Sequence, residues 1–140
     1  MHLDINWTSE LGMSALMLAS QYGHLQAVQL LIEKGADLNL QDKKDSSMSA
    51  LMLALENGHL RAVELLIEKG ADLNQRDWSG WSALTWASKQ GHLQVVQLLI
   101  EKGANVNLVN KNGESALMVA SWEGHLQVVQ MLIEKGADVT

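Results

Sequence analysis

The 140-residue chain contains no cysteine, no proline and no phenylalanine. The lack of cysteine excludes disulfides and thiolate catalysis, and it fits a compartment that keeps thiols reduced. No apolar run reaches the ~18 residues that a membrane span needs. The N-terminus also lacks the basic and apolar stretches of a signal peptide. These absences predict a cytoplasmic protein with no membrane partner.

Clusters of basic residues are also absent. The 16 acidic and 10 basic residues are spread along the sequence and give a net charge of −6. Because such a field repels phosphate backbones, we expect no nucleic-acid partner. Hydrophobic residues make up 47% of the chain and charged residues 19%, which is typical of folded proteins. The length predicts a single domain, 1–140.

What the sequence does contain is one unit written four times. The strings "SAL", "GHL" and "EKGA" each recur four times, with successive copies 35, 33 and 33 residues apart. The repeats span about 4–36, 37–71, 72–104 and 105–137. The larger first step indicates a two-residue insertion within 42–48. Its polar residues, Lys43 to Ser47, predict a lengthened loop tip.

Each repeat predicts two helices. The serine of "SAL", as at Ser14, suits a helix N-cap because its hydroxyl can accept a bond from a free backbone N–H. The helix after it stops at "GH", and "LQAVQLLIEKG" follows with apolar residues at a period of 3.6. Gly35 then suits the left-handed position after a helix. Polar connections between repeats predict β-turns or fingers. Because one helix pair cannot bury its own apolar face, we expect an all-α solenoid of stacked helix-turn-helix repeats.

These repeats resemble the ankyrin repeat over essentially the whole chain. The family pattern, roughly D-x-x-G-x-T-P-L-H-x-A and then G-H-x-x-V-V-x-x-L-L-x-x-G-A-D-V-N, is matched in the third repeat by Asp77, Gly80, Ser82, Leu84, Ala87, Gly91, His92, Val95, Val96, Leu98, Leu99, Gly103, Ala104, Asn105, Val106 and Asn107. The family's Thr-Pro-Leu-His is Ser-Ala-Leu-Met here, with Thr85 replacing methionine in the third repeat. The resemblance implies a non-catalytic module that binds a protein or peptide through its finger tips and concave groove.

The copies are nearly identical, and "LIEKGADLN" occurs twice unchanged. This favours a recent duplication or a designed ankyrin-repeat protein. A piece of a longer array and an engineered chain both stay open. A second function therefore competes with partner binding: a structural or designed scaffold without its own partner. Such a scaffold would be a monomer or would associate weakly end to end.

No catalytic or metal-binding pattern stands apart from the repeated framework. The chain has no phosphate-cradling glycine loop and no separate Ser-His-Asp set, so we expect no enzyme activity and no cofactor. Equivalent positions on stacked helices lie roughly 8–10 Å apart, while zinc ligands lie about 2 Å from one ion. We therefore expect no metal site and assign a structural role, bonding to nearby backbone, to four histidines that recur in phase: His24, His59, His92 and His125.

Three asparagines close the "GADxN" elements: Asn39, Asn74 and Asn107. An asparagine in a turn bonds its own backbone, which is the role we expect. The resemblance to ankyrin repeats implies one further possibility, because the matching asparagine in that family can be hydroxylated by an oxygen-dependent asparaginyl hydroxylase.

Candidate binding residues are the positions that differ between the copies, at the finger tips and at the ends of the first helices. By resemblance, both sets line the concave groove. We expect three tryptophans to be the anchors, since aromatic residues dominate binding hot spots: Trp78, Trp81 and Trp122. The residues expected to tune specificity are Met13, Tyr22, Met48, Glu56, Lys89, Glu114 and Glu123.

Trp86 occupies a position that is aliphatic in the other three repeats, which predicts a buried or half-buried ring. In a competing interpretation, Trp86 and Trp81 form part of an aromatic cage. "GWSALTWAS" resembles a segment in the ankyrin domains of histone lysine methyltransferases, where tryptophans hold a methylated lysine by cation–π contact. Trp81 and Trp86 match two of those tryptophans. Lys89 replaces an acidic residue of that cage and Val119 replaces its third tryptophan, so a methyl-lysine reader is the lesser alternative.

Overall fold

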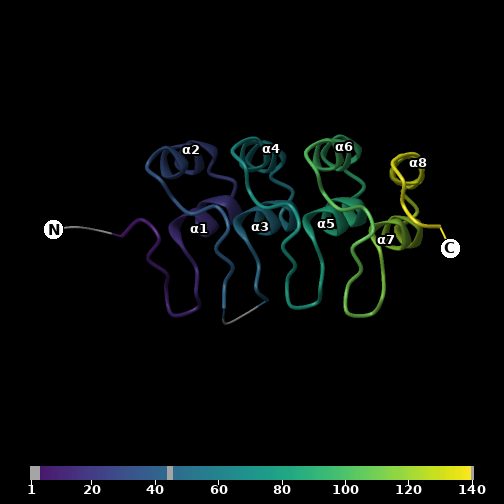
Figure 1. Ribbon diagram of the computed structural model, residues 1–140. Helices are drawn as coiled ribbons and strands as arrows, with labels where there is room; N and C mark the ends of the chain where they lie inside the picture. Colours follow the sequence, from purple (N-terminus) through teal and green to yellow (C-terminus); the bar gives the residue numbers. More distant parts are fainter. Residues whose placement is uncertain (1–3, 44–45, 140) are drawn as a thin grey trace. The chain divides into compact units, whose positions relative to one another are not determined.

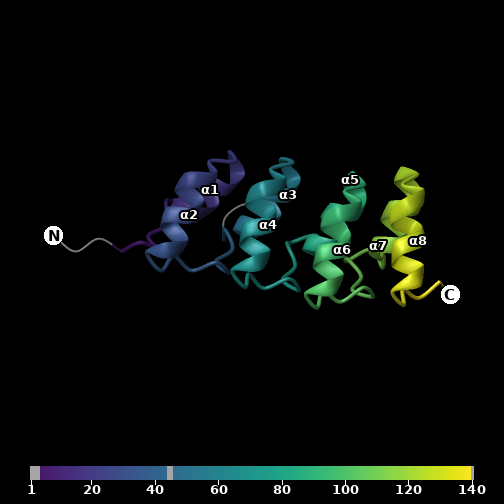
Figure 2. The ribbon, with the colours of Figure 1, turned by 90° about the horizontal axis from the view of Figure 1, so that it is seen from above.

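The computed structural model describes residues 4–43 and 46–139 (Figures 1 and 2). Within them all regular secondary structure is helical, as the sequence predicted, and two compact units appear. The first half, Met1–Asp72, holds α1 (Ala15–Gln21), α2 (Leu25–Glu33), α3 (Ala50–Glu56) and α4 (Leu60–Glu68). The second half, Leu73–Thr140, holds α5 (Ala83–Gln90), α6 (Leu93–Glu101), α7 (Ala116–Glu123) and α8 (Leu126–Glu134).

Each half is two layers of antiparallel helix pairs. In the first half α1 packs against α3 and both pack against their partners α2 and α4; in the second half α5 and α7 do the same with α6 and α8 (Figure 1). The core is aliphatic, with fully buried side chains such as Leu51 and Leu66 in the first half and Leu84 and Leu99 in the second. None of the helices in the described ranges has the length and apolar character needed to cross a bilayer.

The serine caps predicted at the first helices are confirmed. The hydroxyl of Ser14 accepts a hydrogen bond from the Met17 backbone N–H at 3.2 Å, and the other three first helices begin in the same way. Met17 replaces the histidine of the family pattern, and its sulfur accepts a bond from the Ser14 N–H at 3.4 Å. A methionine therefore supplies the second half of a capping box.

Fingers precede the first helices, at residues 9–13 and 42–48 in the first half and 77–81 and 110–114 in the second. In each finger the first residue donates its backbone N–H to the carbonyl of the last, as Asp77 does to Trp81 at 3.0 Å. Isolated bridges flank three of the fingers. Residues 44 and 45 of the predicted insertion lie outside the described residues.

The two fingers of the second half touch each other. The Lys111 N–H donates to the Ser79 carbonyl at 3.0 Å. Gly80 lies at this contact with φ of +83°, and a Cβ there would be 2.9 Å from the Asn110 Cα. Only glycine combines this backbone conformation with so close an approach. The contact between the fingers therefore helps to set the backbone positions of Trp81 and Glu114, which end these two fingers.

The asparagines of the connections join successive repeats. Asn39 accepts a bond from the Asp72 N–H at 2.7 Å, Asn74 from the Asn105 N–H at 2.8 Å, and Asn107 from the Asp138 N–H at 2.9 Å. These bonds reach the next repeat, a partner that the expected bond to the asparagine's own turn did not include. Stacking places the backbone of the next repeat within reach of each side-chain oxygen. Hydroxylation of these residues stays a prediction.

Histidines join repeats as well. His125 Nε2 lies 2.8 Å from the Lys89 carbonyl oxygen, so α7 and α8 are tied to the end of α5. A side chain on Gly91 would collide with the His125 ring, and one on Gly23 would collide with the His59 ring. The predicted structural role is confirmed for His125.

Candidate partner-binding site

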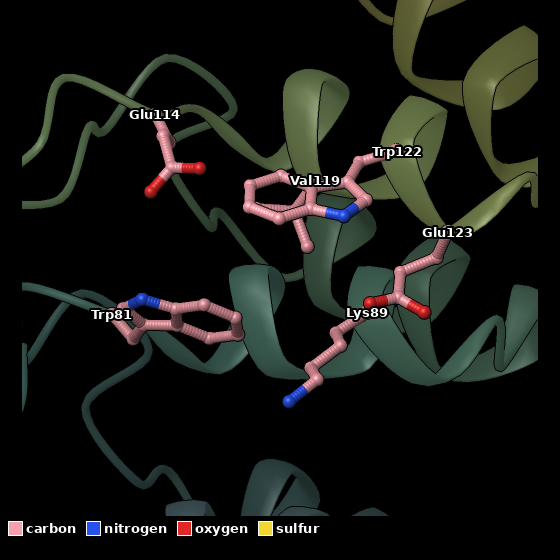
Figure 3. A pocket seen from close by; sticks show the side chains of 6 residues that line it. All are labelled: Trp81, Lys89, Glu114, Val119, Trp122 and Glu123. Atoms are coloured by element: carbon pink, nitrogen blue, oxygen red, sulfur yellow. The ribbon is translucent and has the colours of Figure 1, made fainter.

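The second half contains a hollow of about 170 Å³ between α5, α7 and the finger before α7 (Figure 3). We call it the second-half hollow. Two indoles, one aliphatic side chain, two carboxylates and one ammonium line it: Trp81, Val119, Trp122, Glu114, Glu123 and Lys89.

Asp77 fixes the aromatic wall of this hollow. Its carboxylate is buried, and one oxygen accepts bonds from the backbone N–H groups of Ser79 and Trp81, each at 2.9 Å. The other oxygen accepts from the Trp86 indole N–H at 3.3 Å. Trp86 is half-buried, and its ring centroid lies 4.9 Å from that of Trp81, with the planes inclined at 52°. One carboxylate thus holds the backbone of one tryptophan and the ring of the other.

The ammonium group of Lys89, near the end of α5, lies over both of these rings. It lies 5.4 Å from the Trp81 ring centroid and 5.7 Å from that of Trp86. Both distances suit cation–π attraction. The backbone of Lys89 is held in turn by His125. A methyl-lysine cage would need the same space over Trp81 and Trp86 for a cation of the partner, so this geometry argues against that alternative.

The opposite wall comes from α7 and its finger. Trp122, in the last turn of α7, is 76% exposed, while Val119 one turn earlier is buried and forms the floor. Glu114 is fixed by Asn110, whose side chain accepts from the Glu114 N–H at 2.9 Å and donates to one of its carboxylate oxygens at 3.0 Å. Glu123 ends α7 and is exposed. The second-half hollow is therefore an aromatic slot whose lining carries two negative charges and one positive charge.

The described residues hold four helix pairs, each preceded by a finger, and three asparagine connections. The sequence comparison identifies the family to which this pattern belongs. A family model of ankyrin repeats (3 copies) matches residues 1–77 and 75–140. The chain belongs to the ankyrin-repeat family. Ankyrin repeats are generally protein-interaction modules and are typically non-catalytic. The comparison with curated proteins gives no match.

The ankyrin frame places a second hollow at the same point of the first half, with a volume of about 370 Å³. This first-half hollow is lined mainly by aliphatic and polar side chains: Leu11, Met13, Leu18, Gln21, Tyr22, Asp42, Ser46, Leu53 and Glu56. By repeat register Met13 stands where the second half has Trp81, and Glu56 stands where it has Trp122. Each hollow lies within its own half.

The ankyrin frame therefore divides the predicted binding residues into two groups. Five of them line the second-half hollow: Trp81, Lys89, Glu114, Trp122 and Glu123. Three line the first-half hollow: Met13, Tyr22 and Glu56. Trp78 lies at a finger tip, 54% exposed, and lines neither hollow.

The prediction that Met48 contributes to the binding surface is wrong. Its side chain is only 2% exposed, so it belongs to the core and is not available to a partner. The Asp42 N–H donates to the Met48 carbonyl at 3.0 Å, which closes the longer finger at this residue. Repeat register alone equates this residue with Trp81 and Glu114, which are half-buried. Repeat register therefore does not determine whether a side chain at this position is buried.

Asp77 is the positioning residue that sequence reasoning missed. A signal for it existed, because a residue with a side-chain oxygen recurs at this point of the fingers, as Asp42, Asp77 and Asn110. Asp42 accepts a bond from the Ser47 N–H at 2.7 Å, and Asn110 accepts from its own finger. Their shared role is to fold the finger. Only Asp77 also binds a tryptophan ring, and that pairing required the structure.

Among residues 4–43 and 46–139, no three side chains of the metal-binding types lie close enough to hold an ion.

Proposed function

We propose that this chain is a non-catalytic module that binds a protein or peptide through its finger tips and its hollows, with the second-half hollow as the main anchor site. The observation that carries the proposal is the pairing of Trp81 and Trp122 on opposite sides of one hollow (Figure 3). Tryptophan is among the residues most enriched in the hot spots that carry most of the binding energy at protein interfaces.

Support for a rigid binding surface comes from the contacts beneath it. Trp81 is held through Asp77, Glu114 through Asn110, and the end of α5 through His125. Side chains fixed before binding lose little conformational entropy when a partner arrives. Trp78 at the finger tip and Tyr22 beside the first-half hollow extend the proposed surface.

The test is a pull-down from a broad lysate that compares the intact chain with a variant carrying Trp78→Ala, Trp81→Ala and Trp122→Ala. We expect the triple variant to lose partners that the intact chain retains. Trp7→Ala is the matched control, since Trp7 is 76% exposed and lines neither hollow. Circular dichroism must first show equal helix content in all variants. Identical partner sets from the intact chain and the triple variant would contradict the proposal.

A second candidate function is a repeat scaffold that stacks end to end. Met118 of α7 is 52% exposed, whereas its counterparts Met17 of α1 and Thr85 of α5 are 1% and 3% exposed. Stacking within each half therefore buries this position on the first helix of the pair, and it stays open on α7. Leu18 of α1 is exposed while its counterpart Leu53 is buried, so the face of α1 on a second copy could cover α7 as one repeat covers the next.

Sedimentation over a range of concentrations tests this second function. Stacking predicts a mass that rises with concentration and a return to the monomer in Met118→Glu. Gln127→Glu, which changes an exposed residue of α8, controls for added charge. A monomer at every concentration would exclude end-to-end stacking and leave partner binding in place.

A further inference from the structure

Building on the proposed function, we propose that the second-half hollow takes one arginine side chain of the partner, with the guanidinium between the indoles of Trp81 and Trp122 and hydrogen-bonded to Glu114 and Glu123. Size, shape and charge each point to this occupant.

Size limits the occupant to one side chain. Ligand pockets for drug-sized molecules occupy ≈ 300–1,000 Å³, and the hollow measures about 170 Å³. A cavity of about 150 Å³ accommodates benzene, which is the scale of a single planar group. The hollow is therefore of the size of one side chain of a peptide.

Shape favours a flat group. Figure 3 shows the Trp81 and Trp122 rings on opposite sides of the open space, with Val119 behind it. A guanidinium is planar and weakly hydrated, and it stacks on aromatic faces more readily than an ammonium does. Its aliphatic stem would lie against Val119, which is buried at the floor.

Charge favours a cation with several donors. Glu114 and Glu123 enter the hollow from two different sides (Figure 3). Asn110 binds one carboxylate oxygen of Glu114 and leaves the other for a partner. A guanidinium offers five N–H donors in a fixed plane and pairs with carboxylates in a bidentate manner. The net charge of −6 on the chain would also attract a basic segment.

Other side chains fit less well. An acidic group would meet two carboxylates, and an aliphatic group would remove those carboxylates from water without pairing them. A methylated lysine would find its place over Trp81 and Trp86 already taken by the Lys89 ammonium. Arginine differs because it uses the Trp81–Trp122 slot and leaves Lys89 where it is.

The test begins with a random peptide display library selected on the intact chain. We expect the enriched peptides to share an arginine, and their affinity to fall about tenfold when that arginine becomes citrulline, which keeps the shape and removes the charge. Lysine and trimethyllysine at the same position are the comparison peptides, and each should bind more weakly than arginine.

Variants of the chain locate the arginine. Glu114→Gln and Glu123→Gln should each weaken binding about fivefold to tenfold, whereas Glu101→Gln, an exposed carboxylate on α6 outside the hollow, should not. Lys89→Met should tighten binding about twofold, because it removes a nearby positive charge.

The outcomes separate this proposal from the broader one. Enriched peptides without arginine that still depend on Trp81 and Trp122 would overturn the arginine proposal and support the binding function. Trimethyllysine that binds more tightly than arginine would also overturn it, in favour of the cage. A selection that enriches no peptide would count against the arginine proposal and against peptide binding alike.

Discussion

The two hollows occupy the same place in the repeat frame and differ almost entirely in their side chains. In each half the hollow lies beside the fingers and between the first helices of two stacked pairs. The first-half hollow has a volume of about 370 Å³ and is lined by aliphatic and polar side chains with one tyrosine. The second-half hollow has a volume of about 170 Å³ and two indoles in its lining. The repeated backbone arrangement produces a hollow in each half, and the variable side chains determine its size and chemistry.

A shared frame can support such different surfaces because the contacts that recur in both halves do not use the variable side chains. The serine caps and the asparagine bonds recur in both halves. Finger-forming oxygens also recur, as at Asp42 and Asp77. Substitution at a groove position therefore costs the fold little and changes binding directly.

The largest expected effect is a loss of stability when a side chain is added at the contact between the two fingers of the second half. Gly80→Ala should destabilise the second half by about 2–4 kcal/mol, because the new Cβ meets the neighbouring finger and φ is positive. Gly113→Ala is the matched control, with φ of +76° and open space around the Cβ position, and should cost about 1 kcal/mol. Urea unfolding measures both values. Equal losses would show that the finger contact contributes nothing.

The next largest effect is expected in partner affinity, which should depend on the second-half hollow more than on the first-half hollow. Trp81→Ala and Trp122→Ala should each weaken a partner by about 2 kcal/mol, or roughly thirtyfold. Met13→Ala and Glu56→Ala, at the equivalent positions of the first half, should change affinity much less. Titration calorimetry with a partner found by pull-down measures all four. A larger loss from the first-half pair would move the main anchor site to the first-half hollow.

Asp77 has two roles that substitutions can separate: it folds its finger, and it holds the Trp86 ring. Asp77→Ala leaves several donors without an acceptor and should cost about 1–2 kcal/mol of stability. Asp77→Asn should keep most of that stability, because Asn110 performs the backbone role with an amide in the next finger. It should still alter the tryptophan fluorescence through the lost bond to Trp86. Unchanged fluorescence in Asp77→Asn would show that the bond does not hold the ring.

The smallest expected effect is that of Lys89. Lys89→Met keeps the aliphatic stem and removes the ammonium, so stability should fall by no more than about 0.5–1 kcal/mol. Fluorescence of the Trp81–Trp86 pair should change, while Lys111→Met on an exposed finger residue should leave it unaltered. Identical spectra for both variants would mean that the ammonium spends little time over the rings.

Much of the fold could be predicted from sequence because it depends on local chemistry repeated in register. A serine before a helix, a glycine after it and an apolar period of 3.6 act over a few residues. Four copies of the same signals also identified the family. The asparagine bonds were the exception, since their partners lie about one repeat further along the chain and no local rule indicates them.

The sequence by itself determined the helix pairs, their caps, the family and the set of variable positions. Only the tertiary structure decided how those positions are used. It buried Met48, tied Trp86 to Asp77, set Lys89 over two rings and brought Trp81 and Trp122 to one hollow. The physical reason is that helix formation is local, whereas the direction of a groove side chain depends on the path of each finger and on the repeat stacked beside it.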